Sequence, residues 1–287
     1  MSKQKVLNKF LENGKGAGSK KPLILFADID GTLVNHDMKI SRKDRQAIEA
    51  FMEQGNYFTL ATGRGRTNAE YFMHSVPSNF PAIFGNGALL YHRNQDKVIR
   101  EHTMSTQGLS KLVEVMKDFY PDVMVQIYTK DNIFLVTDND ENDPRVANHH
   151  PYQRAQLKEL EGMECSKVLF GMQDDNCDEG REIAWNHVKE HLPDLRVVKS
   201  QSLYLELTPE GVSKGEMIRF VQEHTDAMVA VAGDYFNDLE MLEEADIAYT
   251  LKSSPKEVQA AADRILDSEP GEFISLVIAE LLEDAEG

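Results

Sequence analysis

Residues 25–34 read LFADIDGTLV and set two carboxylates, Asp28 and Asp30, directly after an apolar run. The run LILFA at 23–27 is typical of a buried strand, and like charges crowded at its end repel one another unless something compensates them. A second apolar run, AMVAVAG at 227–233, is also followed by acids, Asp234 and Asp238. Solvated loop acids would explain one such cluster but explain two poorly. The pattern indicates a cation site.

The sequence around these runs alternates between strand and helix signals. Apolar strand patterns at 57–64 and 247–251 are separated from the first two by amphipathic helix patterns, of which 41–55 begins with Ser41 and Asp44 in capping-box spacing. This alternation predicts an α/β fold with a doubly wound, Rossmann-like parallel sheet. Ligands of such sheets bind beyond the carboxyl ends of the strands, where both acidic clusters should lie.

The middle of the chain has a different texture, which we interpret as an inserted α+β domain. A helix with one apolar face over 109–119 precedes a hairpin pattern over 123–138, a long polar loop at 139–153, and further strands and a helix. We therefore expect a core made of 22–89 and 203–287 and an insertion over 90–202. Residues 1–21 contain a short possible helix and then a Gly- and Lys-rich linker, and we expect them to form a flexible N-terminal extension.

Composition excludes several classes of partner. The formal net charge of −17 is unfavourable for binding nucleic acid, whose phosphates require clustered Lys and Arg. No apolar run reaches the ~18 residues of a membrane helix. Two cysteines cannot build a disulfide framework, so we expect a reducing, cytoplasmic location. We expect a monomer or a weak homodimer.

Four motifs in this order resemble the signature motifs of the haloacid dehalogenase (HAD) superfamily: DIDGTLV (28–34), LATGR (60–64), GVSKG (211–215) and GDYFNDLEML (233–242). The stretches NGALLY (86–91) and LELTPEGVSKG (205–215) resemble its Cof-type phosphatases. The resemblance implies a Mg2+-dependent phosphatase that hydrolyses small phosphorylated metabolites, such as a sugar phosphate or a similar phosphomonoester, through an aspartyl phosphate. It also implies that 90–202 is a Cof-type α/β cap, which closes over the core and selects the substrate.

The resemblance also implies roles for individual residues. Asp28 would be the nucleophile, and Asp30 would protonate the leaving alcohol and then deprotonate water. The phosphoryl group would be held by Thr62, Gly63, Arg64 and Lys214. The Mg2+ ligands would be Asp28, the backbone carbonyl of Asp30, and Asp234, with Asn237 and Asp238 in support.

Other interpretations of the same residues remain open. Arg64 could instead form a surface salt bridge, and we interpret Asn86 and Gly87 as a hinge turn rather than as direct contacts. A phosphomutase or phosphosugar transferase would use the same nucleophile but would shield the intermediate from water. A non-catalytic metabolite-binding regulator could use the same fold.

Overall fold

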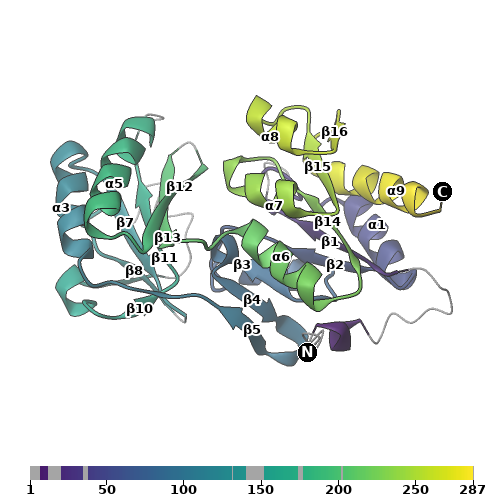
Figure 1. Ribbon diagram of the computed structural model, residues 1–287, viewed down its shortest axis with the longest axis horizontal. Coiled ribbons are helices and arrows are strands. Elements are labelled where there is room, and N and C mark those ends of the chain that lie inside the picture. The colour runs from purple at the N-terminus through teal and green to yellow at the C-terminus, as the bar shows by residue number, and fades with distance from the viewer. Residues whose placement is uncertain are drawn as a thin grey trace. The chain divides into compact units, whose positions relative to one another are not determined.

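The structure is a computed structural model that describes residues 7–11, 21–34, 38–130, 132–139, 152–173, 177–201 and 203–286 (Figure 1). It divides into two compact units. The first comprises Met1–Thr62, Tyr71–Ile99 and Ser213–Gly287, and the second comprises Gly63–Glu70 and Arg100–Val212. Compared with the expected insertion at 90–202, the second unit is shifted toward the C-terminus and includes the short segment after Thr62. The assignment of a catalytic core and a cap to these units stays a prediction.

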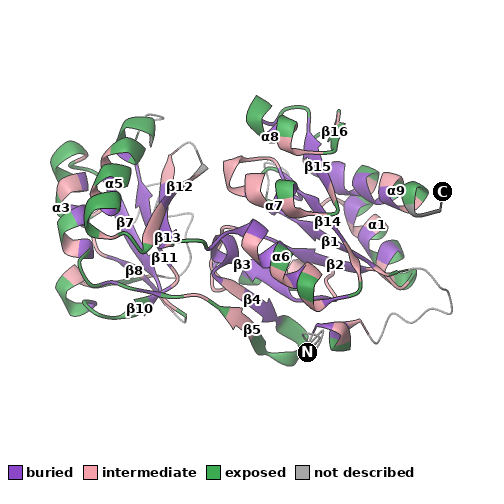
Figure 2. Ribbon diagram, viewed as in Figure 1, coloured by how far each residue is buried: buried purple, intermediate pink, exposed green. Residues whose placement is uncertain are grey.

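A five-stranded parallel sheet forms the centre of the first unit. Its order is β16 (Arg264–Leu266), β15 (Ile247–Leu251), β14 (Met228–Ala232), β1 (Leu23–Ala27) and β2 (Tyr57–Leu60). Every residue of β1 and β2 is buried, as expected for strands covered on both faces (Figure 2). The α/β class and the parallel, doubly wound sheet predicted from the sequence are confirmed.

Helices cover both faces of this sheet (Figure 1). On one face α1 (Arg42–Glu53) packs against α9 (Phe273–Glu286), and the backbone N–H of Ser275 donates to Asp44 Oδ1 at 2.8 Å. Ser41 caps α1 by accepting from the backbone N–H of Asp44, at the position that the sequence predicts. The other face carries α6 (Lys214–His224), α7 (Leu239–Glu244) and α8 (Lys256–Ala261).

A small three-stranded sheet belongs mostly to the first unit, whereas Arg100 and Glu101 of its last strand belong to the second. It contains β3 (Ala82–Phe84), β4 (Leu89–His92) and β5 (Lys97–Glu101), and it follows the short helix α2 (Glu70–Ser75). A parallel bridge between Ala61 and Ile83 joins β3 to the end of β2. The turn between β3 and β4 is thereby held beside the strand end that leads to Thr62.

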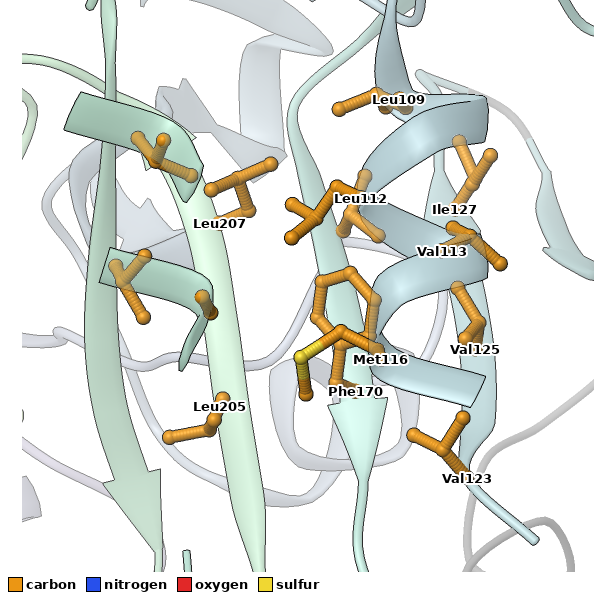
Figure 3. Close-up of a cluster of buried hydrophobic side chains, with 14 of the residues drawn as sticks. Leu109, Leu112, Val113, Met116, Val123, Val125, Ile127, Phe170, Leu205 and Leu207 are labelled. Atoms are coloured by element: carbon orange, nitrogen blue, oxygen red, sulfur yellow. The ribbon is translucent and has the colours of Figure 1, made fainter. Parts of the chain in front are cut away.

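The second unit is a six-stranded, mainly antiparallel sheet with two helices on one face. The strand order is β12 (Leu195–Gln201), β13 (Tyr204–Pro209), β11 (Lys167–Gly171), β7 (Met124–Tyr128), β8 (Ile133–Leu135) and β9 (Tyr152–Arg154). Figure 3 shows apolar side chains of α3 (Leu109–Phe119), among them Leu112 and Met116, packed with Phe170 and other strand residues. α5 (Cys177–His191) contributes to the same core, and β6 (Met104–Ser105) pairs with β10 (Glu164–Cys165).

Two further segments bear on the sequence-based expectation. In the expected N-terminal extension, the described residues 7–11 form a 3-10 turn where a short helix was possible; this turn buries Leu7 and Phe10, and the Phe10 ring stacks on His92 with centroids 4.7 Å apart. The predicted polar loop at 139–153 is wrong at its end, because Tyr152–Arg154 forms β9, parallel to β8; its residues 140–151 lie outside the described part. A search of the described helices finds none long and apolar enough to cross a membrane.

Candidate active site

Three carboxylates meet at the carboxyl edge of the parallel sheet. Asp28 directly follows β1, and Asp234 and Asp238 follow β14. These strands are parallel neighbours, with Ala27 opposite Ala232, so both leave the sheet at the same edge. One carboxylate oxygen from each acid lies within 4.8 Å of the other two. The structure thus brings together acids that are about two hundred residues apart in the sequence.

A buried ammonium group lies among these acids. Ser213 caps α6 by accepting from the backbone N–H of Glu216, and the next residue, Lys214, is fully buried. Lys214 Nζ donates to Asp28 Oδ1 at 2.7 Å and to Asp238 Oδ1 at 2.6 Å. A cation in the first turn of a helix is mildly unfavourable toward the helix dipole, and the two ion pairs offset that cost.

Desolvation makes Asp28 and Asp234 difficult to ionise. Desolvation raises the pKa of Asp28 well above its ordinary value; Lys214 opposes this increase, whereas the neighbouring carboxylates add to it. Desolvation and the charge of Asp238 raise the pKa of Asp234 to about 7, against the opposing hydrogen bond from Thr32. Three acids share one ammonium group, so a further cation would favour the ionised forms of Asp28 and Asp234.

The donor set of this cluster fits Mg2+. Carboxylate and amide oxygens are the ligands that this ion prefers. Asp238 accepts from Lys214 with one oxygen and from the backbone N–H groups of Asp234 and Tyr235 with the other, at 3.0 and 3.2 Å, which suits it to hold its neighbours in place. Asn237 Oδ1 is buried and, within the described part of the chain, has no hydrogen-bond partner, so it is an oxygen that a cation could satisfy.

The turn after β1 wraps around Asp234. Gly31 has φ +84°, and a Cβ there would lie 2.4 Å from Asp234 Oδ2. Only glycine permits both this backbone conformation and this approach. The buried Thr32 hydroxyl donates to Asp234 Oδ1 at 2.6 Å. Asp30 is half-buried in the same turn, and its charge raises the pKa of both Asp28 and Asp234, so it lies within electrostatic reach of them.

Thr62 follows β2 and is fully buried. Its backbone N–H donates to the carbonyl of Ile83, and its carbonyl accepts from the N–H of Asn86 at 3.1 Å. Asn86 is itself buried, has φ +53°, and accepts from Asn237 Nδ2 at 3.0 Å. The turn that contains Asn86 therefore connects the end of β2 with the loop after β14.

Gly63 and Arg64 belong to the second compact unit. There the carbonyl of Gly63 accepts from Lys167 Nζ at 2.7 Å, and the Arg64 charge acts on the pKa of Tyr128. The structure therefore brings Asp28, Lys214, Asp234 and Asp238 together within one unit, and it gives Gly63 and Arg64 partners in the other.

Sequence reasoning missed some residues of the site. Asn86 was interpreted as part of a hinge turn, yet it also holds Asn237. The Gly-Asn-Gly sequence gave a signal, since Asn tolerates positive φ, and the next glycine is needed because a Cβ on Gly87 would lie 2.1 Å from the carbonyl oxygen of Ser213. The partners of Thr32 and Lys167 lie far away in the sequence and left no local signal.

Comparison with known proteins identifies a matching family, several relatives and similar solved structures. The profile of a family described as haloacid dehalogenase-like hydrolase matches residues 25–276. The 5-amino-6-(5-phospho-D-ribitylamino)uracil phosphatase YitU of Bacillus subtilis is 23% identical over 248 residues, which cover 85% of this chain and 92% of the relative. The pyridoxal phosphate phosphatase YbhA of Escherichia coli is 23% identical, with 89% and 97% covered. The crystal structure of TM0651 from Thermotoga maritima superposes with a TM-score of 0.71 at 28% identity, covering 91% of this chain and 97% of that one.

Proposed function

The chain belongs to the haloacid dehalogenase-like hydrolases and is a Cof-type phosphoric monoester hydrolase, and from this membership we propose a Mg2+-dependent phosphatase of small phosphorylated metabolites that works through an aspartyl phosphate. The observation that carries the proposal is the convergence of Asp28, Asp234 and Asp238 around buried Lys214. A phosphate ester carries negative charge, so it can enter this site only if cations offset the acids. Mg2+ and Lys214 would supply that compensation.

Asp28 is the nucleophile in this proposal. Its carboxylate attacks phosphorus, the bond to the leaving oxygen breaks, and an aspartyl phosphate forms. Burial raises the pKa of Asp28, so the cations that favour its ionised form are needed for attack at neutral pH. Lys214 supports the assignment because it fixes Asp28 Oδ1 and thereby the orientation of the carboxylate.

Asp30 moves the protons. It gives a proton to the leaving alcohol and takes one from the water that hydrolyses the intermediate. Its half-buried position in the turn two residues after Asp28 supports this role, because the side chain keeps access to solvent. Thr62, Gly63, Arg64 and Lys214 hold the phosphoryl oxygens.

Asp28, the carbonyl of Asp30, and Asp234 hold Mg2+, supported by Asn237 and Asp238. The ion supplies Lewis-acid polarisation of the phosphoryl group when it is bound. Thr32 and Gly31 support the ligand role of Asp234, since the hydroxyl and the bare glycine fix where its carboxylate lies. The backbone N–H groups that donate to Asp238 do the same for the loop after β14.

The substrate is a phosphomonoester of a small metabolite, such as a sugar phosphate, and the protein acts in the cytoplasm as a monomer or weak homodimer. The two phosphatase relatives support this class, because both of their named substrates are phosphate monoesters of small molecules. A panel of sugar phosphates, pyridoxal phosphate and phosphoribityl compounds, assayed by release of inorganic phosphate, narrows the class.

The test is hydrolysis of p-nitrophenyl phosphate with and without Mg2+, by the wild type and by Asp28→Asn. The amide keeps the shape of the carboxylate but is a poor nucleophile, so we expect turnover to fall by at least about a thousandfold. Circular dichroism checks that the variant is folded. Acid quenching during turnover should leave phosphate covalently bound to the wild type only.

An active Asp28→Asn variant would refute the assignment of Asp28 as the nucleophile. Turnover that is unchanged in EDTA would refute the proposed dependence on Mg2+. Release of inorganic phosphate from a single substrate separates hydrolysis from transfer to a second sugar.

A further inference from the structure

The second unit contains a buried ammonium group that the proposed chemistry does not use. Lys167, the first residue of β11, is 3% exposed. Its Nζ donates to Glu206 Oε1 at 2.9 Å and to the carbonyl oxygen of Gly63 at 2.7 Å, and it lies 4.6 Å from the centre of the Tyr128 ring. A buried ion pair seldom stabilises a fold more than apolar residues of similar size would, so stability alone does not explain why Lys167 and Glu206 are buried here.

The polar partners of Lys167 lie on one face of the sheet. Side chains alternate along a strand, and Ile127 and Val168 face the core formed with α3 and α5, whereas Tyr128 packs in a different cluster. Lys167 and Tyr128 are directly paired in the β11–β7 register. Together with Glu206 on β13, they form a polar group on the sheet face away from the two helices.

This group holds the segment 63–70, which follows the proposed phosphate-binding residue Thr62. The segment belongs to the same compact unit as the sheet, although Thr62 belongs to the other. Gly65 packs on the Tyr128 ring so closely that a Cβ would lie 2.9 Å from Tyr128 Cδ1. The segment therefore has two anchors on the sheet, one polar at Gly63 and one apolar at Gly65.

We propose that Lys167 is a positioning residue for phosphate binding, which acts by fixing the peptide between Gly63 and Arg64. Because that peptide is planar, a fixed carbonyl oxygen on Gly63 also fixes the direction of the Arg64 N–H. Glu206 supplies the countercharge that keeps the Lys167 ammonium in place. This inference rests on the proposed function of Thr62, Gly63 and Arg64.

The proposed role has a kinetic signature. The segment 63–70 would bind the phosphoryl group, which all substrates share. Its displacement should therefore weaken the binding of every phosphate ester, and of inorganic phosphate, by the same factor. A residue that contacts the leaving group would change different substrates unequally. A purely structural residue would change the free energy of unfolding but leave KM and the inhibition constant of phosphate unchanged.

The experiment uses Lys167→Met/Glu206→Gln in the full chain. The second substitution avoids leaving a buried carboxylate without its partner. Loss of one charge-assisted hydrogen bond predicts an increase of about tenfold in KM for p-nitrophenyl phosphate and for pyridoxal phosphate, and in the inhibition constant of inorganic phosphate, with a smaller change in kcat. Lys111→Met, which removes an ammonium from an exposed pair with Glu114 in the same unit, should change each constant by less than about twofold.

Gly65→Ala tests the same inference by another route. Its methyl group would displace the segment from the Tyr128 ring while Lys167 stays in place, so the same parallel increase is expected, and this variant decides the matter if the double variant does not fold. A folded variant with unchanged KM and phosphate inhibition, or shifts that differ by more than about threefold between substrates, would overturn the inference. If the wild type hydrolyses no ester, the proposed function fails, whereas calorimetric binding of inorganic phosphate still tests Lys167.

Discussion

Replacement of Lys214 by Met should destabilise the first unit strongly, and the size of the loss should depend on pH. The substitution removes a fully buried ammonium that donates to Asp28 and Asp238 at 2.7 and 2.6 Å. Each charge-assisted hydrogen bond contributes about 1.5–3 kcal/mol, and removal of one partner from a buried pair costs about 3–5 kcal/mol. Protonation of Asp28 offsets part of the loss, so we expect a loss of about 3–5 kcal/mol near pH 8.

The pH dependence follows from the pKa of Asp28. Its folded-state pKa is raised by burial, and Lys214 opposes that increase, so removal of the lysine raises the pKa further. An acid with a raised pKa binds protons more tightly in the folded state, so stability falls as the pH rises from the unfolded pKa through the folded one. At lower pH, Asp28 of the variant binds a proton and no longer needs the countercharge. The loss should therefore shrink as the pH is lowered.

The assay is chemical denaturation followed by far-UV circular dichroism, in EDTA so that no metal replaces the lysine. The chain's one tryptophan, Trp185, lies in α5 of the second unit and would report that unit instead. Lys252→Met is the matched control, because Lys252 forms a pair with Asp267 at the same 2.6 Å but with both side chains exposed. We expect it to cost at most about 1 kcal/mol. A Lys214→Met loss no larger than the control, or one that does not shrink as the pH is lowered, would refute the electrostatic reasoning.

Two further substitutions test the packing of the first unit. Gly31→Ala should weaken Mg2+ binding, measured by calorimetry, by about tenfold or more, because its Cβ would lie 2.4 Å from Asp234 Oδ2. Gly211→Ala is the control: Gly211 has a similar positive φ but open space around it, so this variant should leave Mg2+ affinity unchanged. Phe10→Ala should lower the free energy of unfolding by about 3–5 kcal/mol, because Phe10 is only 5% exposed. Phe119 is 60% exposed, so the control Phe119→Ala should lower it by about 0.5 kcal/mol or less. Equal losses would show that the N-terminal turn does not pack as described.

The central part of the site could be predicted because it depends on repeated local patterns. Alternating strands and helices predict a parallel sheet, and parallel neighbours end at one edge, so acids after β1 and β14 had to come close. Lys214 was a candidate because it stands in GVSKG, one of the four stretches that resemble the HAD motifs. What the sequence could not reveal is its complete burial between two carboxylates, one of them 186 residues away.

The packing of the N-terminal turn could not be predicted for the same kind of reason. Leu7 and Phe10 stand in a polar, Lys-rich stretch, which favours an extension without fixed structure. The surface that receives them is built by distant residues: Phe10 packs against Phe80 and His92, and the backbone N–H of Leu7 donates to the carbonyl of His224 at 3.1 Å. Two apolar side chains three positions apart carry a weak signal until such a surface exists.

The site departs from the rules that stabilise a fold, and the departures share one electrostatic cause. The protein gathers three acids, two of them buried, around one ammonium, and it needs a glycine at positive φ beside Asp234. It also leaves Asn237 Oδ1 without a hydrogen-bond partner among the described residues. In the proposed function, one divalent cation would relieve the crowding of the acids and would satisfy the amide oxygen, and the glycine lets the turn after β1 lie against one of its ligands. A single ligand that relieves several unrelated costs at once is a simpler explanation than separate structural reasons for each. In the proposed function the metal and the phosphate ester would depend on each other, since the acids alone would repel the ester.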